Sequence, residues 1–164
     1  GGDNHFYKTL LDSSWYFPLF WDTAFMIRGR VGYAGGLGGK SLPLYERYYV
    51  GGINTVRGFR FGDAGPKDPS TGEDIGGNKQ LIFNIEYIFP LLREIRLKGV
   101  IFYDAGTAFD DDEPVKFSEL RKSVGGGLRW ISPIGPLRVE WGYNLKPRDG
   151  EKRSLWEFTI GTFF

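Results

Sequence analysis

The stretch LRVEWGYNL, residues 137–145, decides the fold class of this chain. Its odd positions are aliphatic or aromatic, while its even positions carry arginine, glutamate, glycine and asparagine. Strict alternation with a period of two is typical of a β-strand that has one apolar and one polar face. Because Arg138 and Glu140 place charges in mid-strand, the polar face is predicted to line a wet interior.

The same division into apolar and polar faces recurs on both sides of this stretch. It marks residues 6–20, 24–34, 80–89, 97–109, 122–131 and 155–164. The sequence therefore predicts about seven strands of roughly 9–11 residues, the length that a tilted membrane-spanning β-strand requires. Aromatic residues recur near the strand ends, and short turns alternate with long loops, as in outer-membrane barrels. A soluble β-sandwich would also alternate and is the competing fold.

Prolines and an aspartate mark the boundaries of these predicted strands. Pro18 is expected to end the first strand and Pro90 the third, because proline cannot donate a hydrogen bond to a strand ladder. Asp22 marks the turn between the first two strands.

The bulk composition narrows the classes of function. The 164 residues carry a formal net charge of +1, which gives no electrostatic reason to expect a nucleic-acid partner. Aromatic residues make up 17% of the chain and glycines number 25, which fits a β protein with tight turns and an aromatic exterior. Cysteine is absent, so the sequence predicts neither a disulfide framework nor a thiolate metal site.

A long run with poor strand character, residues 35–79, separates the second and third predicted strands. It is rich in glycine but also holds tyrosines and leucines, which is more apolar surface than a solvated linker needs. Loops of this length are usually functional or disordered. The tetrapeptide Val56-Arg57-Gly58-Phe59 lies in this run, and we expect the loop to fold back onto the strands and dock there through Arg57.

This tetrapeptide resembles the VRGF/Y motif on the sixth extracellular loop of BamA-type outer-membrane protein insertases. Other segments resemble the same family, in the same order, over the whole chain. They are residues 38–46, which lead into the loop, the aromatic-Asp-x-Gly motif from Tyr103 to Gly106, the turn at 132–137 and the last strand at 158–164.

The resemblance implies an all-β fold, an antiparallel transmembrane β-barrel with a long loop folded into the lumen. Residues 1–164 would form the C-terminal portion of a 16-stranded barrel, with the periplasmic POTRA domains and the early strands absent. The loop-like start, Gly1 to Asn4, fits a chain that begins inside a larger protein. Seven strands would leave open edges in lipid, so missing strands or further copies of the chain must complete the barrel.

The resemblance also implies two functional sites. In the lumen, Arg57 would pair with acidic wall residues, which by position are Glu86 and Asp104. The planar guanidinium suits carboxylates, and Gly58 allows a close backbone approach. The last strand would form one side of a lateral gate, a weak seam with the first strand. Its expected residues are Phe158, Ile160, Gly161, where a kink or early unpairing is inexpensive, and the aromatic terminus Phe164.

The implied function is that of the central barrel of the outer-membrane protein assembly machinery, which inserts and folds β-barrel proteins by strand templating. The implied partners are unfolded β-barrel substrates, outer-membrane lipids and assembly lipoproteins bound through the absent POTRA domains. The implied location is the outer membrane of a Gram-negative-type bacterium. The alternatives are a polypeptide-secreting transporter of the same superfamily and a small structural or porin-like barrel.

The residues give no support to an enzyme, a cofactor or a metal site. His5 is the only histidine, which argues against a Ser-His-Asp set or a histidine-based zinc site. The acidic stretch at 110–113 lacks the ordered spacing of a calcium loop. The glycines at 35–39 and 125–127 follow no phosphate-loop spacing.

Overall fold

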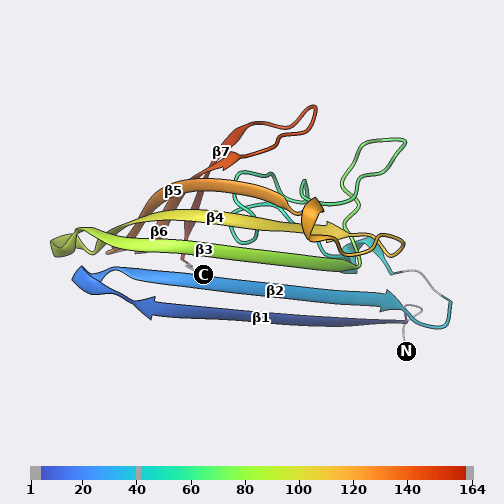
Figure 1. Cartoon of the computed structure of the whole chain (residues 1–164), viewed down its shortest axis with the longest axis horizontal. Coiled ribbons are helices and arrows are strands. Elements are labelled where there is room, and N and C mark those ends of the chain that lie inside the picture. Colours follow the sequence, from blue (N-terminus) through green and yellow to red (C-terminus); the bar gives the residue numbers. More distant parts are fainter. Residues whose placement is uncertain (1–4, 40–41, 162–164) are drawn as a thin grey trace.

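The structure, a computed structural model, describes residues 5–39 and 42–161. Seven strands form a single antiparallel sheet in which each strand pairs with the next along the chain (Figure 1). The strands are β1 (Phe6–Pro18), β2 (Ala24–Gly36), β3 (Lys79–Leu92), β4 (Leu97–Phe109), β5 (Arg121–Ser132), β6 (Gly135–Asn144) and β7 (Ser154–Ile160). Single turns of 3-10 helix interrupt the connections: η1 (Phe20–Asp22), η2 (Leu44–Glu46), η3 (Arg93–Ile95) and η4 (Phe117–Glu119).

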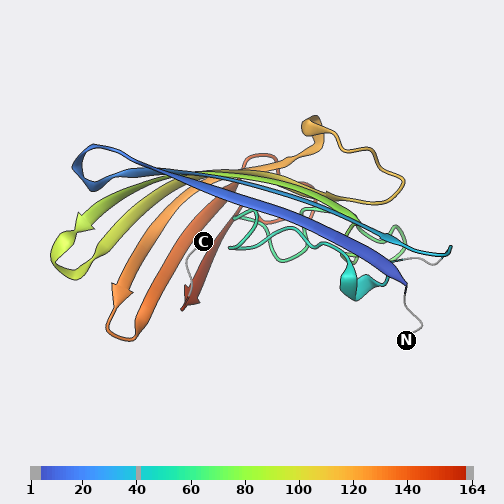
Figure 2. The ribbon, with the colours of Figure 1, turned by 90° about the horizontal axis from the view of Figure 1, so that it is seen from below.

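The sheet is open and curved, with β1 and β7 at its edges (Figure 2). The connection between β2 and β3, residues 37–78, lies on the concave side; we call it the lumen loop. The other long connections, residues 110–120 and 145–153, are at the same end of the strands as the lumen loop, and the short turns are at the opposite end (Figure 1).

The two faces of the sheet differ as the alternation predicts. The concave face carries buried polar side chains from β2 to β6: Arg28, Asn84, Glu86, Asp104, Ser123, Arg129, Arg138, Glu140 and Asn144. The convex face exposes large apolar side chains: Phe25, Ile27, Val31, Tyr33, Phe83, Ile85, Ile101, Tyr103, Leu128, Trp156, Phe158 and Ile160. In the described residues no second sheet covers this apolar face, so the β-sandwich alternative is wrong. None of the helices described is long and apolar enough to cross a membrane.

The concave face also has an apolar patch, which fits the lumen loop. Val56 and Phe59 of the loop pack with Ile82 of β3 and Ala108 of β4 in a fully buried cluster. Nearer the sheet edge, Tyr48 of the loop donates a hydrogen bond of 2.7 Å to a carbonyl of β1. Buried apolar residues of the loop therefore form the core together with residues of the strands, and they hold the loop against the sheet.

Two details of the sequence prediction are wrong. Strands β1 to β5 have 12–14 residues, above the general figure of roughly 9–11 although β4 has the predicted range 97–109, while β7 has 7. The long strands also provide the surface on which the lumen loop packs. Pro90 does not end β3: it pairs with Lys98, and the register shifts between Pro90 and Leu92. Such an irregularity tolerates the missing N–H of proline.

Candidate functional site

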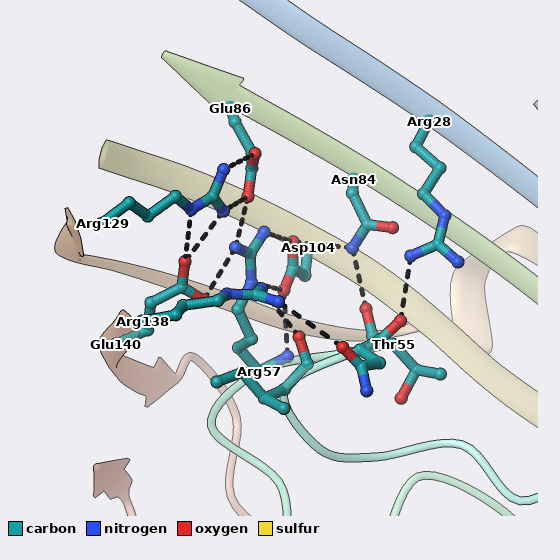
Figure 3. A network of polar contacts seen from close by, with 11 residues as sticks. Arg28, Thr55, Arg57, Asn84, Glu86, Asp104, Arg129, Arg138 and Glu140 are labelled. Atoms are coloured by element: carbon teal, nitrogen blue, oxygen red, sulfur yellow. Dashed lines mark hydrogen bonds and ion pairs between the residues drawn. The ribbon is translucent and has the colours of Figure 1, made fainter. Parts of the chain in front are cut away.

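The guanidinium of Arg57 is buried between the lumen loop and the barrel wall (Figure 3). Its Nε donates to Oδ2 of Asp104 and its Nη2 to Oδ1, each at 2.7 Å, and the backbone N–H of Arg57 donates to Oδ2 at 2.9 Å. Its Nη1 donates to Glu86 and, at 3.1 Å, to Oε2 of Glu140. The arginine thus bridges three carboxylates from β3, β4 and β6.

Two wall arginines complete this cluster. Arg129 of β5 donates from Nη1 to Oε1 of Glu86 at 2.9 Å and from Nη2 to Oε1 of Glu140 at 2.8 Å. Arg138 places its Nη2 2.8 Å from Oε2 of Glu140. Together with Arg57, these residues make a charge-balanced cluster with almost no exposed side-chain surface. Buried charges are tolerated only when they are paired and hydrogen-bonded in this way.

The carboxylates do not depend equally on Arg57. Glu86 and Glu140 each have wall arginines as further partners. Among the described residues, the only salt bridge of Asp104 is with Arg57, and its other side-chain partner is the neutral amide of Asn84 at 2.8 Å. Asp104 is therefore the carboxylate that would lose its only cation if the loop left the wall.

Small residues of the wall make room for this cluster. The ring of Phe102 lies under the Arg57 guanidinium, with 3.7 Å from Cζ to the ring centroid, a cation–π arrangement. A Cβ added to Gly125 would lie 2.6 Å from that ring, and one added to Gly127 would lie 2.6 Å from Cγ of Glu140. The glycine run in β5 thus provides the space that Phe102 and Glu140 occupy.

Hydrogen bonds from the wall hold the loop backbone just before the VRGF tetrapeptide. Three wall side chains each donate to one of three consecutive loop carbonyls. They are Arg138 to Ile53 at 2.9 Å, Arg28 to Asn54 at 2.9 Å and Asn84 to Thr55 at 2.7 Å. Side chains from β2, β3 and β6 therefore fix both the position and the orientation of the turn that presents Arg57.

Two glycine contacts bring the tetrapeptide against the wall. Gly58 has a φ of +89° and packs on Gly142 of β6, where an added Cβ would lie 2.3 Å from the Gly58 nitrogen. A Cβ added to Gly106 of β4 would lie 3.0 Å from Cγ2 of Val56. Phe59 completes the contact under the Arg121 guanidinium, whose Cζ is 4.9 Å from the ring centroid.

The structure thus brings Arg57, Glu86 and Asp104 together in the lumen, and it places Gly106 under the loop. Tyr103, from the same strand motif, lies on the convex face, 36% exposed and on the opposite side of the sheet from Arg57. The sequence alone did not predict that Glu140, the two wall arginines and Phe102 belong to this site. Glu140 could have been predicted as a lumen acid, because it lies on the polar face of the stretch 137–145.

The last strand has an apolar outer face and ends at a turn. Phe158 and Ile160 are exposed on the convex face. Gly161 follows β7 with a φ of +102°, a conformation that favours glycine, and its N–H still donates to the carbonyl of Pro136 at 2.8 Å. Phe164 lies outside the described residues. In the described part of the chain, no group of three or more His, Cys, Asp or Glu residues is arranged to hold a metal ion.

Comparisons with known proteins give a consistent match over the whole chain. The model of the Omp85 superfamily domain matches residues 1–164. The chain is 38% identical over 167 residues to the outer membrane protein assembly factor BamA of Nitratidesulfovibrio vulgaris, covering 100% of this chain and 21% of that protein. It is 33% identical over 197 residues to the protein of the same name from Neisseria meningitidis, covering 100% and 24%.

A solved structure shares the fold. The crystal structure of BamA from Haemophilus ducreyi lacking POTRA domains 1–3 superposes with a TM-score of 0.82 at 28% identity, over 98% of this chain and 35% of that one. The chain spans about a quarter or less of the length of the curated relatives named above.

Proposed function

The chain belongs to the Omp85 superfamily, and on that premise we propose that it is the C-terminal part of the barrel of an outer-membrane protein insertase. Its place is the outer membrane of a Gram-negative-type bacterium. The open sheet fits a partial barrel, since an unpaired sheet edge has no hydrogen-bond partner in lipid. We infer a parent barrel of 16 strands, with the early strands and POTRA domains preceding residues 1–164.

The observation that carries this proposal is the match of the whole chain to two outer membrane protein assembly factors, and within the proposal β7 forms one side of the seam. The outer face of β7 is apolar, it pairs with β6 over only seven residues, and a positive-φ glycine follows it. In a closed barrel the edge of β7 meets the first strand, and a short seam has few hydrogen bonds to break. Once opened, the edge offers backbone N–H and C=O groups to an incoming strand, which is recognition by β-augmentation.

The buried arginine cluster supports the same mechanism from inside the barrel. It fixes the lumen loop to β6, which is next to β7, and to β3 and β4 further along the sheet. A wall held rigidly at this point lets β7 move while the rest of the sheet keeps its register. We assign this anchoring to three loop residues, Val56, Arg57 and Gly58. The acids that pair with Arg57 are Glu86, Asp104 and Glu140.

Substrates and partners follow from this proposal. Two relatives are named outer membrane protein assembly factors, and we infer that the substrates here are unfolded outer-membrane β-barrel proteins. Outer-membrane lipids contact the convex face, and assembly lipoproteins would bind through POTRA domains. No observation favours the secretion transporter or the porin-like barrel.

The test is a reversible lock on the seam. In the full-length protein, a cysteine pair would join β7 to the first strand of the barrel, and insertion of a model β-barrel protein into proteoliposomes would be followed. Insertion should stop when the pair is oxidised and return on reduction. A control pair at Leu128 and Val139, which face each other in β5 and β6, should leave insertion unchanged. A locked seam with normal insertion would contradict strand templating.

A further inference from the structure

A groove opens at the end of the sheet where the long loops lie. It runs between the loop that contains η4 and the loop after β6, has a volume of about 570 Å³ and is lined by residues 118–122 and 145–148. We call it the rim groove. The hydrogen bonds and salt bridges of the Arg57 cluster do not involve these residues, and Arg121 contacts the ring of Phe59 in the VRGF tetrapeptide.

The rim groove is cationic. Lys122, Lys146 and Arg148 line it, and none of them forms a salt bridge with a described residue. The charge of Arg121 is already compensated by a buried salt bridge to Glu151. The only acidic residue in the lining is Glu119, so the groove carries an excess of positive charge. At the opposite end of the sheet, by contrast, Arg93 pairs with Asp22 at 3.6 Å.

The rim groove also has an apolar side that faces lipid. Lys122 and Leu145 are neighbours on the convex face, where the Leu145 N–H donates to the Lys122 carbonyl at 3.1 Å. Phe117 of η4 stacks on Phe83 of the convex face, with 6.4 Å between ring centroids. Figure 2 shows η4 on the side of the sheet opposite to the lumen loop. The loop that forms one wall of the groove thus lies over the lipid-facing surface.

Two general rules place this groove relative to the membrane. In outer-membrane barrels the longer loops are extracellular, and aromatic residues mark the level of the lipid headgroups. Tyr103 and Tyr143 lie on the convex face, with Lys122 and Arg153 just beyond them toward the long loops. Arg153 donates to the Tyr143 hydroxyl at 2.9 Å. The cations of the groove are therefore at the depth of the outer-leaflet headgroups.

From this geometry we propose that the rim groove binds the phosphate-bearing headgroup of an outer-leaflet lipid. Lys122, Lys146 and Arg148 contact the phosphate, as ammonium and guanidinium groups do with oxyanions, and Leu120 and Leu145 cover the first acyl carbons. This inference rests on the proposed outer-membrane orientation. Its consequence is a fixed lipid beside β5 and β6, on the same side of the barrel as the seam.

The experiment measures lipid binding by the full-length protein in nanodiscs of phosphatidylcholine that contain increasing amounts of diphosphoryl lipid A or phosphatidylglycerol. Bound lipid would be counted by native mass spectrometry. The triple variant Lys122→Gln, Lys146→Gln, Arg148→Gln should lower the affinity for the phosphorylated lipid at least tenfold. A matched control, Arg96→Gln with Lys98→Gln at the short-turn end, should leave it unchanged. A gel-mobility test of folding before and after heating checks that each variant is intact.

The outcomes separate the alternatives. Loss of lipid binding in the triple variant alone supports the rim groove, even if the seam-lock experiment fails. Equal binding by the triple variant and the wild type, or equal loss in the control, would overturn the proposal. Competition by millimolar inorganic phosphate as strong as that by the lipid would also overturn it, since it would show a site for free anions. If the triple variant does not fold, the single variant Lys122→Gln is measured instead, and it should also lower the affinity for the phosphorylated lipid.

Discussion

Replacing Arg57 with methionine removes the only cation that pairs with Asp104 in residues 5–39 and 42–161. The side chain of Asp104 has no measurable exposure, so its charge would be left buried without a counter-ion. Breaking a buried ion pair in this way costs about 3–5 kcal/mol, which is roughly two to four powers of ten in the unfolding equilibrium constant. The measurement is urea unfolding of the full-length protein in detergent micelles, followed by tryptophan fluorescence.

A double-mutant cycle isolates the pair. In Arg57→Met with Asp104→Asn, the remaining acids Glu86 and Glu140 are still matched by Arg129 and Arg138, so the double variant should be more stable than the sum of the single effects by about 1.5–3 kcal/mol. Combining Arg57→Met with Glu140→Gln leaves the same number of charges but still strands Asp104. That second cycle should therefore show a clearly smaller coupling, because geometry and not charge number decides the outcome.

If the effects of the Arg57 and Asp104 substitutions add within about 0.5 kcal/mol, the two side chains are not coupled and the buried pair does not stabilise the loop. A control in the same loop is Lys67→Met, which removes two partly exposed salt bridges, to Asp63 at 3.3 Å and to Asp74 at 2.5 Å. Exposed pairs contribute about 0–1 kcal/mol, so this variant should unfold nearly as the wild type does. A large effect of Lys67→Met would mean that the loop is stabilised by its surface and not by the buried cluster.

Three further substitutions test the packing and the membrane-facing surface. Gly142→Ala places a Cβ 2.3 Å from a loop nitrogen and should destabilise the protein by about 1–3 kcal/mol and expose the lumen loop to protease, whereas Gly29→Ala, with its nearest neighbour at 4.0 Å, should do neither. Ile101→Arg in the apolar band should cost about 2–4 kcal/mol when folding is measured in lipid vesicles, and Leu145→Arg at the rim about 0–1 kcal/mol; equal effects would contradict the proposed depth. Tyr48→Phe loses a 2.7 Å hydrogen bond to β1 and should cost about 0.5–1.5 kcal/mol in urea unfolding, with faster hydrogen exchange in β1 as the specific sign.

The sequence predicts which face of each strand a residue occupies, because the direction of a side chain in a strand is set by its own position and the period of two. That rule is enough to place Glu86, Asp104 and Glu140 on the concave face. Arg57 was predicted to dock for a different reason: the loop around it is too apolar for a solvated linker.

The contacts within the cluster depend on distances that a single sequence does not contain. Glu86 and Glu140 are on strands far apart in the chain, and only the register of the intervening strands brings both to the Arg57 guanidinium. Phe102 is an aromatic residue on the polar face of β4, which the alternation alone does not explain. Its position under Arg57 explains it, but only once the loop is in place.

The balance of charge in the cluster has a consequence for ion permeation. Without Arg57, the wall holds three carboxylates, Glu86, Asp104 and Glu140, against two guanidiniums, Arg129 and Arg138. A lumen loop that swings away would therefore leave an excess of one negative charge on this part of the concave wall. Single-channel recordings of such a state should show larger conductance with a preference for potassium over chloride, and the docked state should be nearly silent.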